Sequence, residues 1–296
     1  MRKRNWKEYN RQLVQRGSLT FLIDPKLIKS TENVGLTRQR GRPRQFTDHL
    51  IVMLMMLKIQ YRLAYRALEG FARSVQQLSM NSVPIPTYSA ICKRAARLER
   101  AVPKLSSRRP SVVIMDSSGV KVFGEGEWKV RVHGKSKRRK WLKVHVAIDA
   151  KTQEIVAEVT TDSSVTDGKV APDLLEQVCG RVETVMADGA YDGRDVREAI
   201  RNRGAQALIP PPKNGRLKGD IDRDQALRII HGAGGNGVAR SLWGKLTGYS
   251  LRSLVEATFS RLKRLFGERL FSRILKKQRL EISLKCLILN KMRSQA

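Results

Sequence analysis

Two apolar segments that each end in an aspartate constrain the fold of this 296-residue chain most strongly. Ser-Val-Val-Ile-Met leads into Asp116, and Thr-Val-Met-Ala leads into Asp188. Short apolar runs rich in β-branched residues and bounded by turn residues are typical of buried strands. The sequence therefore predicts a sheet with a carboxylate at the end of each of two strands.

A third acid, Glu256, lies in a segment with helical spacing. Tyr249, Arg252, Glu256 and Lys263 fall within about a 60° arc if the segment is one α-helix, so one helix could aim all four side chains at a single place. Two plainer interpretations stand beside this one. Asp116 could cap a turn, and Glu256 could be an exposed residue that pairs with Arg252 one turn earlier.

The order of the expected elements gives the fold class. Helices are expected near 170–178 and 194–203. Strands are expected at 112–115, 120–123, 142–148, 155–160, 184–187 and 205–209, with a turn at Ser117-Ser118-Gly119 between the first two. This order is typical of a ribonuclease-H-like α/β fold, whose mixed sheet is covered by helices on both faces.

Short motifs along the chain resemble the bacterial insertion-sequence DDE transposases, and the insertion-sequence five family in particular. The resemblance rests on the two strand-end acids and the Tyr, Arg, Glu, Lys spacing, and it covers nearly the whole chain. Further matching motifs are Tyr9-Asn10, Arg16-Gly17-Ser18-Leu19-Thr20, Gly41-Arg42-Pro43, His133-Gly134-Lys135 and Asp188-Gly189-Ala190-Tyr191-Asp192.

The resemblance implies metal-dependent cleavage of DNA at terminal inverted repeats, followed by transfer of the freed 3′-hydroxyl into target DNA. Such chemistry uses two Mg²⁺ or Mn²⁺ ions, which prefer oxygen ligands. Asp116 would bridge both ions, and Asp188 and Glu256 would each hold one. Arg252 and Lys263 would contact phosphates, and Tyr249 would position the DNA backbone or a terminal base.

Charge points to a polyanionic partner. The chain holds 58 Lys and Arg against 27 Asp and Glu, a formal net charge of +31, which exceeds what solubility requires. Residues 144–210, which include Asp188, reverse this bias with 12 acidic and 7 basic side chains. An acidic centre between basic flanks suits a metal site served by phosphate-binding arms. A ribosome-associated basic protein would explain the charge but not the acidic centre.

We expect three regions: a basic arm or linker over 1–46, a helical DNA-binding domain over 47–108, and a ribonuclease-H-like DDE catalytic domain over 109–296. Arg42 and Arg44 in the arm would follow a DNA backbone, although a solvated tail is the alternative. Three short helices after Thr47 fit a helix-turn-helix reader of double-stranded DNA, with Lys93, Arg94 and Arg97 facing outward on the last. A plain three-helix bundle is the competing interpretation.

A Pro- and Gly-rich insertion over about 210–248 is expected to be a flexible loop. Within it, Trp243 could hold a flipped base or could anchor the segment by burial. His133 and Lys135 could bind phosphate, although a surface loop is as good an interpretation of the histidine. Asp149 and Asp192 resemble the three acids in sequence but suit turns or helix caps.

The three cysteines are too far apart for a disulfide framework or a zinc site, and no apolar run is long enough to span a membrane. We therefore expect a cytoplasmic, nucleoid-associated protein with no membrane partner, which forms a homodimer in the synaptic complex because two transposon ends must meet. A catalytically silent DNA-binding regulator is one alternative, but it would not need the three acids. A stand-alone nuclease is another, but it would not need the N-terminal helices.

Overall fold

The computed structural model describes residues 5–15, 17–19, 22, 46–79, 84–98, 102–123 and 140–294. The chain divides into two compact units, Met1–Lys104 with Phe271–Ala296, and Leu105–Leu270. The final helix lies within the range expected for the catalytic domain, 109–296, but belongs to the first unit. The two units are described separately below.

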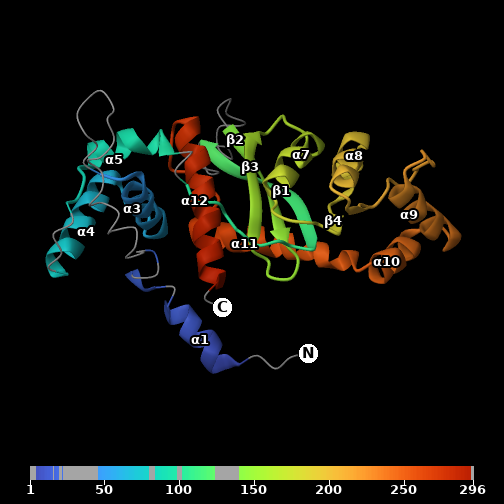
Figure 1. Ribbon diagram of the computed structural model, residues 1–296, viewed down its shortest axis with the longest axis horizontal. Helices are drawn as coiled ribbons and strands as arrows, with labels where there is room; N and C mark the ends of the chain where they lie inside the picture. The colour runs from blue at the N-terminus through green and yellow to red at the C-terminus, as the bar shows by residue number, and fades with distance from the viewer. Residues whose placement is uncertain are drawn as a thin grey trace, which may run out of the picture. The chain divides into compact units, whose positions relative to one another are not determined.

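The first unit is helical. Its central helix α3 (Asp48–Gln60) begins where the Thr47 hydroxyl accepts a hydrogen bond from the Leu50 amide at 3.2 Å, as the sequence predicts. The side chains from Leu50 to Leu57 are all buried, because neighbouring helices cover α3 on several sides. Those neighbours are α4 (Tyr65–Leu78), α5 (Tyr88–Ala95) and α12 (Leu275–Ser294), and the unit also contains α1 (Trp6–Gln15) (Figure 1).

The second unit is built on a five-stranded sheet with the order β3-β2-β1-β4-β5. β2 is antiparallel to β1 and β3, whereas β1, β4 and β5 run parallel. This mixed sheet confirms the predicted ribonuclease-H-like α/β class. The strands are β1 (Val112–Phe123), β2 (Lys140–Asp149), β3 (Ile155–Asp162), β4 (Thr184–Met186) and β5 (Gln206–Leu208).

One sequence expectation about the first strand was wrong. Ser117-Ser118-Gly119 was expected to form a turn between two strands, but β1 continues through it. Ser117 pairs with His145 and Gly119 pairs with Lys143 on β2. The long antiparallel ladder satisfies the backbone groups of this segment, and this outweighs the turn preference of its residues.

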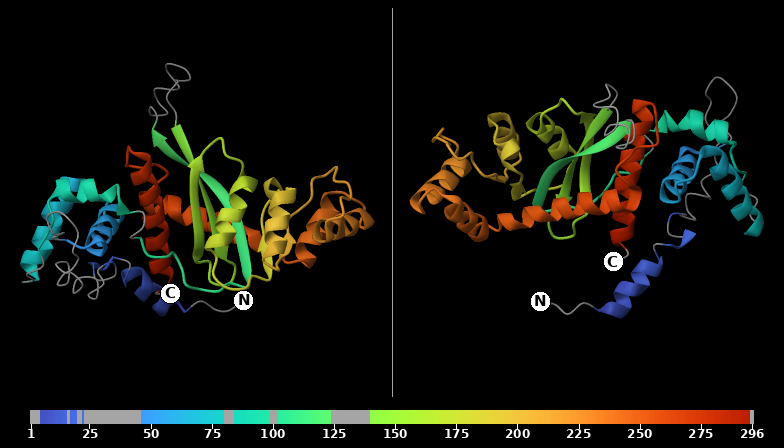
Figure 2. Two further views of the ribbon diagram at one scale, coloured as in Figure 1. Left: turned by 45° about the horizontal axis from the view of Figure 1, so that its top comes forward. Right: turned by 180° about the vertical axis from the view of Figure 1, so that it is seen from behind.

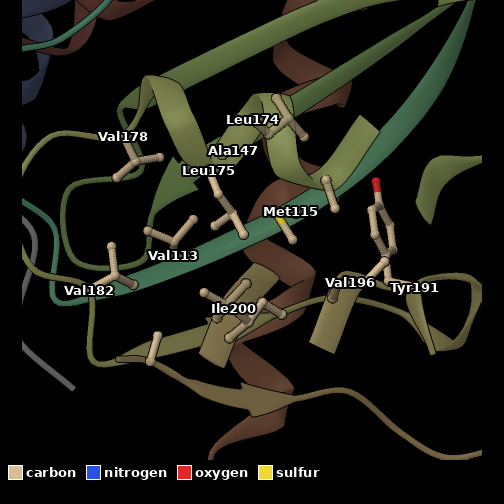
Figure 3. Close-up of a cluster of buried hydrophobic side chains, with 14 of the residues drawn as sticks. Val113, Met115, Ala147, Leu174, Leu175, Val178, Val182, Tyr191, Val196 and Ile200 are labelled. Atoms are coloured by element: carbon tan, nitrogen blue, oxygen red, sulfur yellow. The ribbon is translucent and has the colours of Figure 1, made fainter. Parts of the chain in front are cut away.

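Helices cover both faces of the sheet. α7 (Asp167–Gln177) and α8 (Arg194–Asn202) contribute to the main core, where Val113 and Met115 of β1 meet apolar residues of both helices (Figure 3). α11 (Ser253–Phe266) crosses the opposite face and contacts β1 and β2 (Figure 2). Because side chains alternate along a strand, Asp116 points away from the α7 core and toward the α11 face.

The insertion is not the flexible loop that its glycines and prolines suggested. It contains α9 (Ile221–Gly232) and α10 (Gly237–Leu246), which pack on each other. Asp220 and Asn236 cap these helices by accepting hydrogen bonds from Arg223 N and Ala239 N, each at 3.0 Å. Among the described helices, none is both long and apolar enough to cross a membrane.

Candidate active site

Parallel pairing of β1 with β4 brings Asp116 and Asp188 close together, although Asp116 lies inside β1 and not at a strand end as expected, because β1 continues along β2. Ile114 on β1 pairs with Met186 on β4, and each aspartate lies two residues beyond its paired residue. Asp188 follows β4 and caps a short 3₁₀ helix, Gly189–Tyr191, by accepting a hydrogen bond from the Ala190 amide at 2.9 Å. Neighbouring strands lie about 4.8 Å apart, so the two carboxylates are neighbours in space.

Arg252 joins the third acid to this pair. Its guanidinium donates to Asp116 Oδ2 at 3.1 Å and also forms an ion pair with Glu256. The Asp116 side chain is 16% exposed and the Glu256 side chain 56%. Pairing of Glu256 with Arg252 was the plainer interpretation of the sequence, but the same guanidinium also reaches a strand 136 residues away in the chain. The contact therefore belongs to an assembled site.

The charges of Asp188 and Glu256 both act on the pKa of Asp116. Burial raises this pKa above its ordinary value, and the charges of Asp188 and Glu256 raise it further. The Ser117 amide, which donates to Asp116 Oδ1 at 2.8 Å, and the Arg252 guanidinium act in the opposite direction. Arg252 pairs with Asp116 and Glu256, and together with Asp188 the cluster keeps a formal charge of −2 when all three carboxylates are ionised. We call Asp116, Asp188, Glu256 and Arg252 the acid site.

The acid site matches a divalent metal in ligand chemistry and charge. Its ligands are carboxylate oxygens, which Mg²⁺ and Mn²⁺ prefer, and its negative charge exceeds what Arg252 neutralises. In the described ranges, no three His, Cys, Asp or Glu side chains are spaced so that they could hold a metal ion. Because Arg252 pairs with both Asp116 and Glu256, metal binding has to compete with its guanidinium.

Tyr249 and Arg252 lie on a 3₁₀ helix, Tyr249–Arg252, and α11 begins only at Ser253. The expectation of one α-helix carrying all four spaced residues was therefore wrong. Tyr249 donates its hydroxyl hydrogen bond to the carbonyl oxygen of Ala187 at 3.1 Å. Burial raises the pKa of Tyr249 to about 12, so this hydroxyl keeps its proton at neutral pH.

Trp243 is 3% exposed, and its ring centroid lies 5.3 Å from that of Tyr249. This burial is what the hydrophobic-anchor interpretation of Trp243 expects. Lys263 is half-buried on α11. Within the described part of the chain, no hydrogen bond or ion pair joins it to the three acids.

The remaining expected DNA contacts divide into three groups. Lys93 and Arg97 are exposed, as expected. Arg94 was expected to face outward but pairs with Asp48 and donates to the Phe46 carbonyl oxygen, because the start of α3 offers it an acid and an unpaired carbonyl. Arg42, Arg44, His133 and Lys135 lie outside the described residues.

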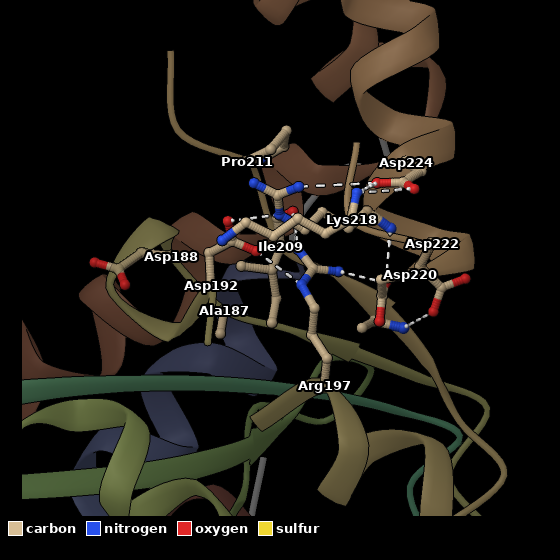
Figure 4. Close-up of polar contacts among 12 residues, drawn as sticks. Ala187, Asp188, Asp192, Arg197, Ile209, Pro211, Lys218, Asp220, Asp222 and Asp224 are labelled. Carbon is tan, nitrogen blue, oxygen red and sulfur yellow. Dashed lines mark hydrogen bonds and ion pairs between the residues drawn. The ribbon is translucent and has the colours of Figure 1, made fainter. Parts of the chain in front are cut away.

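Sequence reasoning missed a second set of acids, near the acid site in the same unit. Asp192 accepts hydrogen bonds from Arg197 at 2.7 Å and from Arg223 at 3.1 Å, and these two arginines are 3% and 5% exposed (Figure 4). Asp220 pairs with Arg197 and Arg201, while Asp224 pairs with Arg223. We call these six residues the charge network. The sequence Asp-Ile-Asp-Arg-Asp at 220–224, an acidic helix start, was its only local signal.

The charge network explains why Asp192 resembled a site residue in sequence. It follows Asp188 by four positions, yet its carboxylate is fully engaged by arginines of α8 and α9. Its role is to attach the helical insertion to the sheet. Asp149 is likewise a turn residue, as predicted, since it accepts hydrogen bonds from the Lys151 amide at 2.9 Å and the Thr152 hydroxyl at 2.7 Å.

The chain is similar in sequence to a curated protein and in structure to several solved structures. An uncharacterized protein of Aquifex aeolicus (strain VF5) is 26% identical over 233 residues, a match that covers 71% of this chain and 66% of that protein. Among solved structures, the piggyBac transposase synaptic complex with hairpin DNA has a TM-score of 0.45 and 11% identity, covering 94% of this chain and 75% of that one. The Mos1 transposase paired-end complex with left transposon end has a TM-score of 0.24 and 11% identity, covering 88% and 82%.

Two family models, each described as a transposase DDE domain, match this chain. One covers residues 14–125 and the other residues 107–291. The second match alone spans more than half of the chain and contains Asp116, Asp188 and Glu256. The chain therefore belongs to the DDE transposase family.

Proposed function

We propose that this transposase cleaves DNA at terminal inverted repeats and joins the freed 3′-hydroxyl to target DNA, with Asp116, Asp188 and Glu256 as its metal-binding acids. The observation that supports this best is that Arg252 pairs with both Asp116 and Glu256 while the charge of Asp188 acts on the same Asp116, so three carboxylates are only partly neutralised. A DNA-binding regulator has no use for such a site, because uncompensated carboxylates repel phosphate and cost stability.

Each residue of the acid site has a distinct part in this proposal. Asp116, whose pKa is raised by burial and by the charges of both other acids, would contribute to both metal positions, while Asp188 and Glu256 would each complete one. Two bound divalent ions would supply Lewis acidity and an activated oxygen nucleophile. Arg252, already paired with Asp116 and Glu256, would hold these carboxylates in place and turn to a DNA phosphate when the metals bind.

Double-stranded DNA would be bound by surfaces beyond the acid site. Lys93 on α5, the last helix of the proposed DNA-binding domain, and Arg97 just beyond its end are exposed, and Lys263 is half-buried on α11. We retain Arg42, Arg44, His133 and Lys135 as proposed phosphate contacts on the basis of their sequence motifs. Two transposon ends must be brought together for joining, so a homodimer on DNA is part of the proposal.

The test uses the purified full chain, Mg²⁺ or Mn²⁺, a labelled inverted-repeat end and a supercoiled target. The expected result is metal-dependent nicking at the end, followed by joining to target. Asp188→Ala should bind the same DNA without cutting it. Asp195→Asn, a change at an exposed aspartate of α8, serves as the matched control and should cut normally.

Each other outcome points to a different function. Binding of the end without nicking by the unaltered chain would rule out the proposed enzyme in favour of the regulator. Nicking without joining, under conditions that supply target DNA, would favour a nuclease. Equal nicking by the unaltered chain and Asp188→Ala would show that the acid site is not the catalytic centre.

A further inference from the structure

Tyr249 makes a contact that a DNA-binding residue would not need. Its hydroxyl reaches the carbonyl oxygen of Ala187, which is 62 residues earlier in the chain and immediately precedes Asp188. Ala187 is fully buried, and its own amide donates to the Leu208 carbonyl oxygen at 3.4 Å. The backbone just before Asp188 is therefore held on one side by β5 and on the other by the Tyr249 hydroxyl.

The ring of Tyr249 is itself held in place. It packs at a tilt of 42° against the ring of Trp243, a buried residue of α10 in the same unit. Gly248, with φ +72°, provides the left-handed turn that ends α10 and starts the 3₁₀ helix at Tyr249. The position of the hydroxyl is thus set by a packed aromatic pair at the end of the insertion.

Tyr249 is also next to the helix that carries the third acid. Arg252, three residues later in the same 3₁₀ helix, contacts both Asp116 and Glu256. One residue therefore links the strand end that presents Asp188 to the helix start that presents Glu256. These two acids come from segments that share no backbone ladder, so their separation is set by packing and by side-chain contacts such as this one.

We propose that Tyr249 is a positioning residue, whose hydroxyl sets the spacing between Asp188 and Glu256, rather than a residue that binds DNA. The inference rests on the proposed function and deepens it. A single neutral hydrogen bond contributes only about 1 kcal/mol to stability. Residues that orient metal ligands, by contrast, typically change metal affinity or activity by about 10- to 100-fold when they are altered.

The test compares Tyr249→Phe with Tyr61→Phe. Both changes remove one hydroxyl and its bond to a backbone carbonyl oxygen, since Tyr61 donates to Gly17 at 3.4 Å in the other unit. The first measurement is amide hydrogen exchange of the segment from 185 to 192 in the full chain without DNA or metal. We expect faster exchange in Tyr249→Phe and unchanged exchange in Tyr61→Phe.

The second measurement is the binding of Mn²⁺ to the same proteins, monitored by electron paramagnetic resonance. We expect Tyr249→Phe to weaken Mn²⁺ binding by about 10-fold or more, while its affinity for an inverted-repeat end in the absence of metal stays within about 2-fold. Unchanged exchange over 185–192 would overturn the inference. Loss of metal-free DNA affinity with unchanged Mn²⁺ binding would overturn it as well, and would make Tyr249 a DNA contact.

Failure of the inference can be told apart from failure of the proposed function. If the unaltered chain does not nick an inverted-repeat end, the proposed function fails, but faster exchange in Tyr249→Phe still supports the positioning role. If the unaltered chain nicks and Tyr249→Phe exchanges at the same rate over 185–192, the positioning role fails and the proposed function stands.

Discussion

The acid site and the charge network are built from the same residue types, but they differ in how far their carboxylates are neutralised. In the acid site one arginine pairs with Asp116 and Glu256 beside a third carboxylate, that of Asp188, whereas in the charge network Asp192, Asp220 and Asp224 are matched by Arg197, Arg201 and Arg223. The pKa values differ accordingly. The pKa of Asp116 is raised by burial and by its acidic neighbours, and that of Asp224 is lowered, first by the backbone amide of Lys218.

The difference separates a site from a scaffold on physical grounds. A neutralised and hydrogen-bonded cluster is stable without any ligand and holds two segments together. A cluster with excess charge is costly in the free protein and is relieved by a cation. Proximity of acids in the sequence does not distinguish these cases, since Asp188 and Asp192 are only four residues apart. The number of arginines around each carboxylate does distinguish a site from a scaffold.

The largest contrast should appear when Asp116 is neutralised. We expect Asp116→Asn to reduce nicking of an inverted-repeat end by at least about 10³-fold, the scale seen when an essential charge-stabilising group is lost. Its thermal stability should be equal to or higher than that of the unaltered chain, because the raised pKa means that the ionised carboxylate opposes folding. Nicking within about 10-fold of the unaltered rate would contradict the assignment.

The opposite pattern is expected for Asp192→Asn. This change leaves Arg197 and Arg223 buried without their shared carboxylate, a loss that typically costs about 3–5 kcal/mol. For a unit of this size the loss corresponds to a fall in melting temperature on the order of 10 °C. Asp195→Asn on the exposed side of α8 is the matched control. A fall no larger than that of the control would show that the charge network does not hold the insertion.

The sequence predicted that Asp188 follows a strand, because an acid after a short apolar run is a local pattern, whereas Asp116 lies inside β1. The caps at Thr47 and Thr87 are local as well, since each threonine accepts a hydrogen bond from the amide three residues later. Arg252 and Glu256 were expected to share a face at a spacing of four, and their ion pair has that spacing. Each of these features is decided within a few residues.

The features that sequence reasoning missed depend on distant partners. β1 continues through Ser117-Ser118-Gly119 because β2 pairs with it there. The glycines that flank the helices of the insertion made this segment resemble a loop in the sequence. These helices are attached by arginines that contact Asp192. Tyr249 appeared to belong to the helix of Glu256, but its hydroxyl is bound by a strand end 62 residues earlier. No local pattern specifies such long-range contacts.

A third contrast concerns metal binding in the absence of DNA. We expect Mn²⁺ at about ten times its dissociation constant to stabilise the unaltered chain by about 1.4 kcal/mol, measured as a rise in melting temperature that a chelator reverses. Asp188→Asn should lose most of this rise, because the acid site loses both a ligand and a charge. Asp195→Asn should keep it. An equal rise in Asp188→Asn would place the metal elsewhere in the chain.

The smallest contrast lies in the dependence of stability on acid. The pKa of Asp224 in the folded protein is below its ordinary value of 3.8, because the amides of Lys218 and Gly219 donate to the ionised carboxylate. Its contribution to stability is therefore present above that value and is lost as the pH falls through the lower folded pKa. Asp116 has a raised pKa, so the folded state takes up its proton first and gains stability over the unfolded chain as the pH falls toward 3.8.

Melting temperatures between pH 7 and pH 2.5 should show a shallower acid decline in Asp224→Asn and a steeper one in Asp116→Asn. Parallel curves for the two variants would contradict the difference in neutralisation on which the comparison depends.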